Sequence, residues 1–173
     1  MDVKIIKNLP VERWEEYKNI KIFSVESEKL AFSESLEKLQ NKSDEDWKKE
    51  IEELEKNKEI LVFIEDENKR LIGFASAHVH NNPRLAHNAF LSNLYVYPEH
   101  RGKGFGIRLI NERIKILKYK YPEVSNLHCE IVTTQISSIE IHKKLGFTIS
   151  GEIKDLFKIN GDFYSEYWLQ KTI

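Results

Sequence analysis

The stretch that decides the fold runs from Leu94 to Ile107 and reads Leu-Tyr-Val-Tyr-Pro-Glu-His-Arg-Gly-Lys-Gly-Phe-Gly-Ile. Its first four residues are strand formers, and Pro98 ends the strand because proline has no N–H for the ladder. Beyond the glycines, apolar residues recur at helical spacing and predict a helix over about 103–120. These residues are Phe105, Leu109, Ile110, Ile114 and Leu117. The stretch therefore predicts a strand, a glycine-rich turn and an amphipathic helix.

The glycine-rich turn has the composition of a phosphate-binding site. Gly102, Gly104 and Gly106 follow one another closely, so the backbone can approach a ligand and turn its N–H groups toward it. The start of the helix adds unpaired N–H donors and partial positive charge. Three cations surround the turn, namely Arg101, Lys103 and Arg108. We expect this turn to hold a phosphate-bearing ligand, the alternative being an ordinary tight turn between strand and helix.

Two common phosphate motifs do not fit this turn. A P-loop requires four residues between its glycines and then Gly-Lys-Ser/Thr, which the stretch lacks. A dinucleotide fingerprint requires a third glycine where Ile107 stands, and it usually follows the first strand of a domain. The pattern that remains is Arg-x-x-Gly-x-Gly directly after a strand, at Arg101, Gly104 and Gly106.

This pattern resembles the coenzyme A site of the GCN5-related N-acetyltransferases, the GNAT family. A second segment, residues 135–147, reads Gln-Ile-Ser-Ser-Ile-Glu-Ile-His-Lys-Lys-Leu-Gly-Phe and resembles the family's Asn-x-x-Ala-Ile-x-Leu-Tyr-Glu-Lys-Leu-Gly-Phe. Gln135 and His142 stand where asparagine and tyrosine are usual. With Ser138 they share one face of a predicted helix, which in the family faces the pantetheine arm and the thioester. The resemblance is good over roughly residues 58–170.

The resemblance implies that acetyl-CoA is the cofactor and that an amine attacks its thioester directly. It also implies that the strand before the glycine turn leaves its neighbour at a β-bulge, so that freed backbone groups pair with pantetheine. The cofactor-binding residues that it implies are Leu94, Tyr95, Val96, Arg101, Gly102, Lys103, Gly104, Phe105, Gly106, Ile107, Gln135 and Ser138.

His142 is the expected catalytic residue, acting as a general acid on the departing thiolate. A free thiol has a pKa near ~8.5 and imidazole near ~6.5, so proton transfer from imidazolium to thiolate is downhill. The alternative is a histidine that only packs or caps the helix. Many relatives carry a glutamate base on the strand before the glycine turn, but this strand has Phe90 at roughly that position. The base stays open, the candidates being His78, His80, His87, or ordered water with backbone carbonyls.

The acceptor side gives weaker signals. Leu30-Ala31-Phe32-Ser33 resembles a substrate-side segment of some family members. Glu26, Glu28 and Glu34 lie where relatives build the acceptor pocket, the alternative being a solvated helix face. Tyr164, Glu166 and Trp168 share one face of the last predicted strand, which either packs in the core or borders the acceptor pocket.

Composition limits the function. The 173 residues form one predicted domain, 1–173, and a formal net charge of −1 argues against nucleic-acid binding. The single cysteine, Cys129, is compatible with a reducing cytosol. The chain has no apolar run long enough to span a membrane, no signal peptide and no metal-binding constellation, so we expect a cytoplasmic protein with no membrane or metal partner. By analogy with other exposed strand edges of this fold, a homodimer is an open possibility.

The periodicities predict the order β-α-α-α-β-β-β-α-β-α-β-β, an α/β fold with a mixed, mostly antiparallel sheet flanked by helices. The expected function is acetyl transfer from acetyl-CoA to the primary amine of a small molecule, such as an amino acid, a polyamine or an amine antimetabolite. The alternatives are acetylation of a protein N-terminus or lysine and a non-catalytic acyl-CoA-binding module. The expected strands are 3–7, 60–64, 71–79, 87–97, 127–132, 147–159 and 163–170, and the expected helices lie at 8–21, 26–40, 43–54, 103–120 and 136–144.

Overall fold

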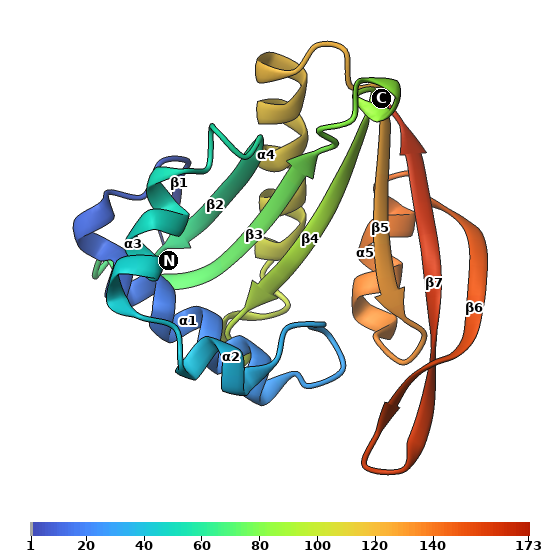
Figure 1. Cartoon of the computed structure of the whole chain (residues 1–173), viewed down its shortest axis with the longest axis horizontal. Helices are drawn as coiled ribbons and strands as arrows, with labels where there is room; N and C mark the ends of the chain where they lie inside the picture. The colour runs from blue at the N-terminus through green and yellow to red at the C-terminus, as the bar shows by residue number, and fades with distance from the viewer. Residues whose placement is uncertain (1) are drawn as a thin grey trace.

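The computed structural model describes residues 2–173, which form a seven-stranded sheet in the order β1-β2-β3-β4-β5-β7-β6. All neighbouring strands are antiparallel except β4 and β5. Figure 1 shows the sheet with helices against its faces, as the sequence predicts. The strands are β1 (Lys4–Ile6), β2 (Glu59–Glu65), β3 (Leu71–Val79), β4 (Asn88–Val96), β5 (Asn126–Val132), β6 (Thr148–Ile159) and β7 (Asp162–Thr172), and the helices are α1 (Trp14–Ser27), α2 (Leu36–Gln40), α3 (Asp44–Glu52), α4 (Phe105–Lys120) and α5 (Ile136–Lys144).

Two hydrophobic clusters hold the helices on opposite faces of the sheet. One cluster joins α4 and α5 to the face that carries Val62, Ala75 and Leu127. The other joins α1 and α3 to the face that carries Phe63 and Phe74. Because successive strand residues point to opposite faces, strands β2, β3 and β4 each contribute buried residues to both clusters, whereas β5 and β7 contribute them only to the first. The odd-numbered residues of β5 face α4 and α5, and its even-numbered residues face the other side.

Local signals in the sequence are confirmed at several element ends. The Ser43 side chain accepts a hydrogen bond from the Asp46 amide at the start of α3, the expected cap. Gly146 adopts φ +85° and ends α5. The β6–β7 turn has Asn160 at φ +53° and Gly161 at φ +97°, as expected of a two-residue hairpin turn.

The predicted helix over 26–40 is wrong. Helix α1 runs on to Ser27, and only Leu36–Gln40 forms a second helix. Residues 28–35 are not helical because they make tertiary contacts with the strand and turn that lead into α4. The Glu28 carboxylate accepts a hydrogen bond from Arg101, and the Phe32 ring packs against Tyr95 at 6.3 Å between centroids. Residues 28–35 therefore cross the sheet as an irregular segment, here called the crossing segment.

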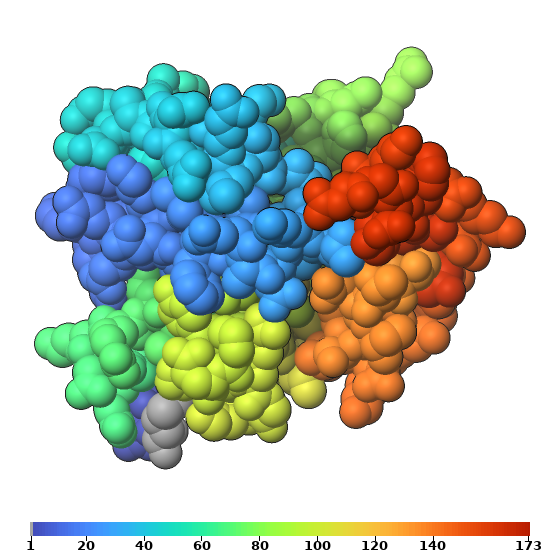
Figure 2. Space-filling view, turned by 90° about the horizontal axis from the view of Figure 1, so that it is seen from below, coloured from blue at the N-terminus to red at the C-terminus, as the bar shows by residue number. Residues whose placement is uncertain are grey.

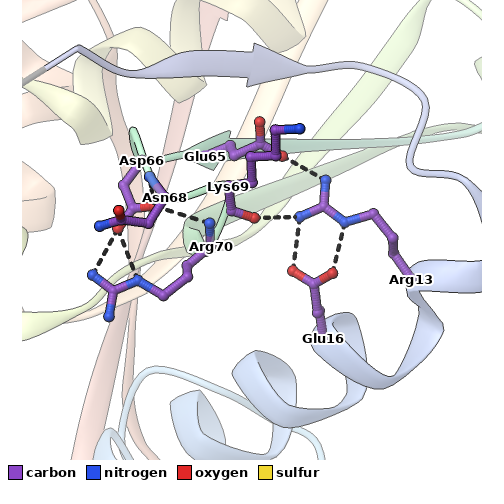
Figure 3. A network of polar contacts seen from close by, with 7 residues as sticks. All are labelled: Arg13, Glu16, Glu65, Asp66, Asn68, Lys69 and Arg70. Atoms are coloured by element: carbon purple, nitrogen blue, oxygen red, sulfur yellow. Dashed lines mark hydrogen bonds and ion pairs between the residues drawn. The ribbon is translucent and has the colours of Figure 1, made fainter.

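A polar network fixes the start of α1, and with it the path into the crossing segment. The Arg13 guanidinium donates to both carboxylate oxygens of Glu16 and to the Lys69 carbonyl, and it pairs with Glu65 (Figure 3). Lys69 and Glu65 belong to the β2–β3 hairpin. The first turn of α1 is thus tied to the β2–β3 hairpin, in the half of the sheet remote from β6 and β7.

The sheet opens between its two parallel strands. Strands β4 and β5 are paired only at Asn88–Phe90, beyond which they diverge (Figure 1). On the β3 side, the register shifts by one residue between Ser92 and Tyr95, and Asn93 adopts φ +49°. This is a β-bulge in β4. The bulge and the separation that the sequence resemblance implies are both confirmed, and they create a gap in the middle of the sheet.

Candidate active site

A cavity of about 480 Å³ occupies the gap between β4 and β5. Its walls come from the crossing segment, β4, β5, α5 and the β6–β7 hairpin. Figure 2 views the open end of the gap, where the blue crossing segment lies beside the red tip of the hairpin. The cavity therefore passes through the sheet from the α4–α5 face to the face that the crossing segment covers.

The glycine turn lies at the C-terminal end of β4 and leads into α4. Gly102 and Gly104 adopt φ +74° and +78°, a region that residues with a Cβ rarely occupy. The amides of residues 102–104 donate to no other backbone carbonyl within residues 2–173, and the next amides belong to the unpaired first turn of α4. The turn thus presents a run of free N–H groups at a helix N-terminus, which is an anion-binding arrangement.

The side chains of the turn have other partners. Arg101 donates from Nε to the Val96 carbonyl at 2.9 Å and from Nη2 to Glu28 Oε1 at 2.7 Å. Lys103 Nζ donates to the Glu99 carbonyl at 3.0 Å. Arg101 therefore links the end of β4 to the end of α1, and any contact of this turn with phosphate rests first on its backbone.

The predicted residues of β4 divide between the gap and the core. Leu94 lines the cavity, and it and Asn93 have no ladder partner in β3. Tyr95 is buried against the α1 side, and Val96 packs in the α4 cluster, so only the backbone of these two residues is available to a ligand. The edge of β4 toward β5 is unpaired from Leu91 onward.

Helix α5 places Gln135, Ser138 and His142 along the same cavity, as the helical spacing predicts. His142 is 3% exposed, and its Nδ1 lies 2.8 Å from the Ser138 carbonyl. Since a carbonyl only accepts, Nδ1 carries the proton. Burial lowers the pKa of His142 to about 4, so the ring is neutral near pH 7 and Nε2 is unprotonated. The imidazolium form expected of a general acid is a minor species in this environment.

The opposite wall of the cavity carries two carboxylates. Glu166 on β7 is 7% exposed, lines the cavity and has no ion-pair partner within residues 2–173. Glu130 on β5 is its diagonal neighbour, because Val132 pairs with Glu166 and Glu130 pairs with Trp168. Burial, and then the charge of Glu130, raise the pKa of Glu166 to about 7.

The sequence indicated Glu166 only as one of three residues on a strand face. Its two strand neighbours on that face, Tyr164 and Trp168, do not line the cavity. Glu166 differs from these two aromatic residues in being a carboxylate among apolar and aromatic residues. Its position facing the gap depends on the register of β7 with β5, which the sequence does not show. Sequence reasoning also missed Arg113 of α4, a buried cation in the cavity wall.

Of the other residues that the sequence suggested for the base and the acceptor pocket, some line the cavity and others do not. His78 lines the cavity and stacks on Phe90, with 5.3 Å between ring centroids, whereas His80 and His87 do not line it. Burial lowers the pKa of His78. Within the crossing segment, Leu30, Ala31, Phe32, Ser33 and Glu34 line the cavity, Glu28 pairs with Arg101, and Glu26 lies outside.

Comparisons with known proteins agree with this geometry. The model of the acetyltransferase (GNAT) family matches residues 22–147. A spermidine N(1)-acetyltransferase of Vibrio cholerae is 29% identical over 165 residues, covering 94% of this chain and 82% of that protein.

Two solved structures show the same fold. A phosphinothricin acetyltransferase of Sinorhizobium meliloti in complex with acetyl-CoA has a TM-score of 0.83 and 22% identity, with 100% of this chain and 89% of that chain covered. A ribosomal-protein-alanine N-acetyltransferase of Brucella melitensis has a TM-score of 0.82 and 22% identity, with 98% and 99% covered. The chain belongs to the GNAT family and is an acetyl-CoA-dependent N-acetyltransferase.

The residues present fit acetyl-CoA. The free amides at residues 102–107 suit a pyrophosphate, the unpaired edge of β4 suits the amides of pantetheine, and the gap is open where a thioester must lie. The cofactor supplies an activated acetyl group. Within residues 2–173, no helix has both the length and the apolar character needed to cross a bilayer.

Proposed function

We propose that this enzyme acetylates the primary amine of a small molecule, and that Glu166 receives that amine. The observation that carries the proposal is a buried carboxylate, in the wall of the cavity facing the gap, that has no ion-pair partner among residues 2–173. Burying a carboxylate without a partner is costly, and an incoming ammonium would supply the missing opposite charge. The enclosure of the cavity by the crossing segment and the hairpin favours a small acceptor over a folded protein.

Glu166 is also the proposed general base. An amine must lose a proton to attack the thioester, and a base is most effective when its pKa lies near the working pH. Burial and Glu130 bring the pKa of Glu166 to about 7. The carboxylate role that relatives place on the strand before the glycine turn would then be taken by β7, across the gap from Phe90.

The cavity has a polar side chamber that favours a di- or polyamine among small amines. This chamber, of about 150 Å³, shares Glu34, Ser92 and Asn93 with the main cavity and is also lined by Glu50 and Glu59. Lys21 pairs with Glu34 and Lys42 pairs with Glu50, which leaves Glu59 without an ion pair among the described residues. A second ammonium beside Glu59 would extend the acceptor away from the bulge.

The first test is a thermal-unfolding scan with acetyl-CoA and with ATP as control. A ligand present at 100 times its Kd stabilises by about 2.7 kcal/mol, which raises the midpoint by roughly 5–10 °C for a chain of this size. A shift with acetyl-CoA alone is expected. No shift at millimolar acetyl-CoA would contradict the assignment of the glycine turn.

The second test measures release of coenzyme A with a panel of acceptors. The panel contains spermidine, a diamine and a monoamine of equal length, an amino acid, and a peptide with a free N-terminal alanine. We expect kcat/KM for the diamine to exceed that for the monoamine by at least about tenfold, since one additional charge-assisted contact contributes about 1.5–3 kcal/mol. Turnover of the peptide alone would replace the small-molecule proposal with protein acetylation.

A further inference from the structure

Helix α4 carries a guanidinium that is almost completely enclosed. Arg113 is 1% exposed, and no carboxylate within residues 2–173 forms an ion pair with it. Its Nη1 donates to the Ser76 carbonyl at 2.6 Å and to the Ser92 carbonyl at 2.8 Å. These residues face each other across β3 and β4 beside the bulge, where ladder groups lose their usual partners. One corner of the guanidinium thus completes the hydrogen bonding of the bulge.

The rest of the guanidinium has no hydrogen-bond partner in the described part of the chain. Nε and Nη2 are buried and make no hydrogen bond within residues 2–173, although Arg113 lines the cavity together with Cys129 and His142. A buried cation without compensation costs several kcal/mol, and a neutral donor would suffice to brace two carbonyls. The unpaired N–H groups therefore indicate that the cation meets a negatively charged partner that enters the cavity.

The titratable groups around Arg113 do not supply that charge. Burial raises the pKa of the Cys129 thiol to about 12 and lowers the pKa of His142 to about 4, so both are neutral near pH 7. Burial also lowers the pKa of His78 on β3, which is neutral as well. Glu130 and Glu166 lie on the opposite face of the sheet from α4, because they alternate with the α4-facing residues of β5 and β7.

The transfer reaction creates negative charge in the gap. A carbon–nitrogen bond forms at the acetyl carbon, the carbon–sulfur bond breaks, and its electron pair leaves on sulfur, while the amine proton passes to a base. His142, which lines the cavity from α5, is neutral near pH 7 and would offer the sulfur no ready proton. A thiol of pKa near ~8.5 leaves more readily as thiolate when a fixed cation stabilises it.

We propose that Arg113 stabilises the thiolate of coenzyme A through its unpaired Nε–H and Nη2–H groups, while Nη1 holds the bulge open. The inference rests on the acetyl-CoA cofactor and not on the identity of the acceptor. The Arg113 cation is supplied by α4, the helix whose N-terminus forms the glycine turn, so one element provides both the anion-binding turn and the charge for the leaving group.

The test compares binding of coenzyme A with binding of acetyl-CoA, which has no free thiol, from about pH 6.5 to 9. If the bound thiol loses one unit of pKa, from about 8.5 to about 7.5, the affinity for coenzyme A relative to acetyl-CoA rises by about sevenfold over this range. The ultraviolet absorbance of thiolate in the complex gives the same pKa directly. Equal pH dependence for the two ligands in the wild-type protein would overturn the proposal without any variant.

Two substitutions assign the effect to Arg113. Arg113→Gln keeps amide donors for the two carbonyls but removes the charge, and should abolish the rise in affinity. Arg113→Lys keeps a positive charge but loses the fixed arrangement of guanidinium N–H donors, and should retain less than about half of the shift in thiol pKa. Lys118→Met, an exposed cation on the same helix, is the matched control and should behave as wild type.

The midpoint of thermal unfolding in the presence of acetyl-CoA shows whether each variant is folded and binds the cofactor. A variant that binds acetyl-CoA as wild type and still shows the full shift would reduce Arg113 to a brace for the bulge. Should Arg113→Gln not fold, Arg113→Lys decides alone, because an unchanged thiol pKa in that variant contradicts the proposal. A loss of the shift together with intact acetyl-CoA binding supports it, whatever amine the enzyme uses.

Discussion

The two halves of the active site are built in different ways. The proposed cofactor half consists largely of backbone N–H groups from consecutive residues, 102–107, at the start of α4. The proposed acceptor half consists of side chains from the crossing segment, β3, β4, β5 and β7, of which Leu30 and Glu166 are 136 residues apart in the chain. A site made of consecutive backbone groups needs only a local turn of the right shape. A site made of distant side chains needs every strand in register.

This difference has consequences for substitution. A change in the cofactor half should act on coenzyme A affinity, and a change in the acceptor half should act on turnover and its pH dependence. Three variants separate the halves, in order of decreasing effect.

Gly104→Glu should reduce acetyl-CoA affinity by about 1,000-fold or more. The substitution places a Cβ at φ +78° and a carboxylate among the N–H groups that would bind pyrophosphate. Gly161→Glu is the matched control, since Gly161 has φ +97°, open space at its Cβ and a place in the hairpin turn. Titration calorimetry measures both. Similar losses of affinity in the two variants would mean that backbone strain, and not the site, explains the result.

Glu166→Gln should lower kcat/KM for the amine by about 100-fold while changing acetyl-CoA affinity little, since general bases contribute 10²–10⁴-fold. The wild-type rate should rise with pH through about 7, where Glu166 loses its proton, and the variant should lack this rise. Glu152→Gln, an exposed carboxylate of β6 outside the cavity, is the control. A variant that keeps the wild-type pH profile would remove Glu166 as the base.

The same residue gives a stability signature. The pKa of Glu166 is raised in the folded state to about 7, so its contribution to stability is present below its unfolded pKa near ~4.5 and is lost as pH rises through about 7. Glu166→Gln should therefore gain stability relative to wild type as pH increases over this window. Chemical denaturation at several pH values measures the difference.

His142→Phe should leave turnover within about threefold of wild type and acetyl-CoA affinity little changed, because the neutral ring has no proton on Nε2 to give to the leaving group. The folded pKa is lowered to about 4 from about 6.5, so the stability that neutral His142 provides is present above 6.5 and lost as pH falls toward 4, on the order of 3 kcal/mol in all. The variant should lack this loss. A loss of turnover of about tenfold or more would instead give His142 a role in proton transfer beyond its packing against Phe147. His87→Phe, outside the cavity, is the control.

Features that depend on neighbouring residues could be predicted from the sequence, and features that depend on distant contacts could not. The strand, glycine turn and helix of residues 94–120 were predicted because proline, glycine and helical periodicity act within a few residues of each other. The helix over 26–40 was mispredicted because the Arg101–Glu28 pair and the Phe32–Tyr95 contact lie far apart in sequence. A helical pattern carries no information on such distant partners.

Sequence by itself determined the element order, the family and the backbone turn suited to phosphate. The tertiary structure decided the position, hydrogen bonding and protonation state of the side chains in the cavity. The register of β7 with β5 places Glu166 at the gap, and at the bulge in β4 two carbonyls accept hydrogen bonds from Arg113. The packing around α5 buries His142, and this burial lowers the pKa of its ring. Charge and proton affinity depend on burial and on neighbours across the sheet, and these exist only once the chain has folded.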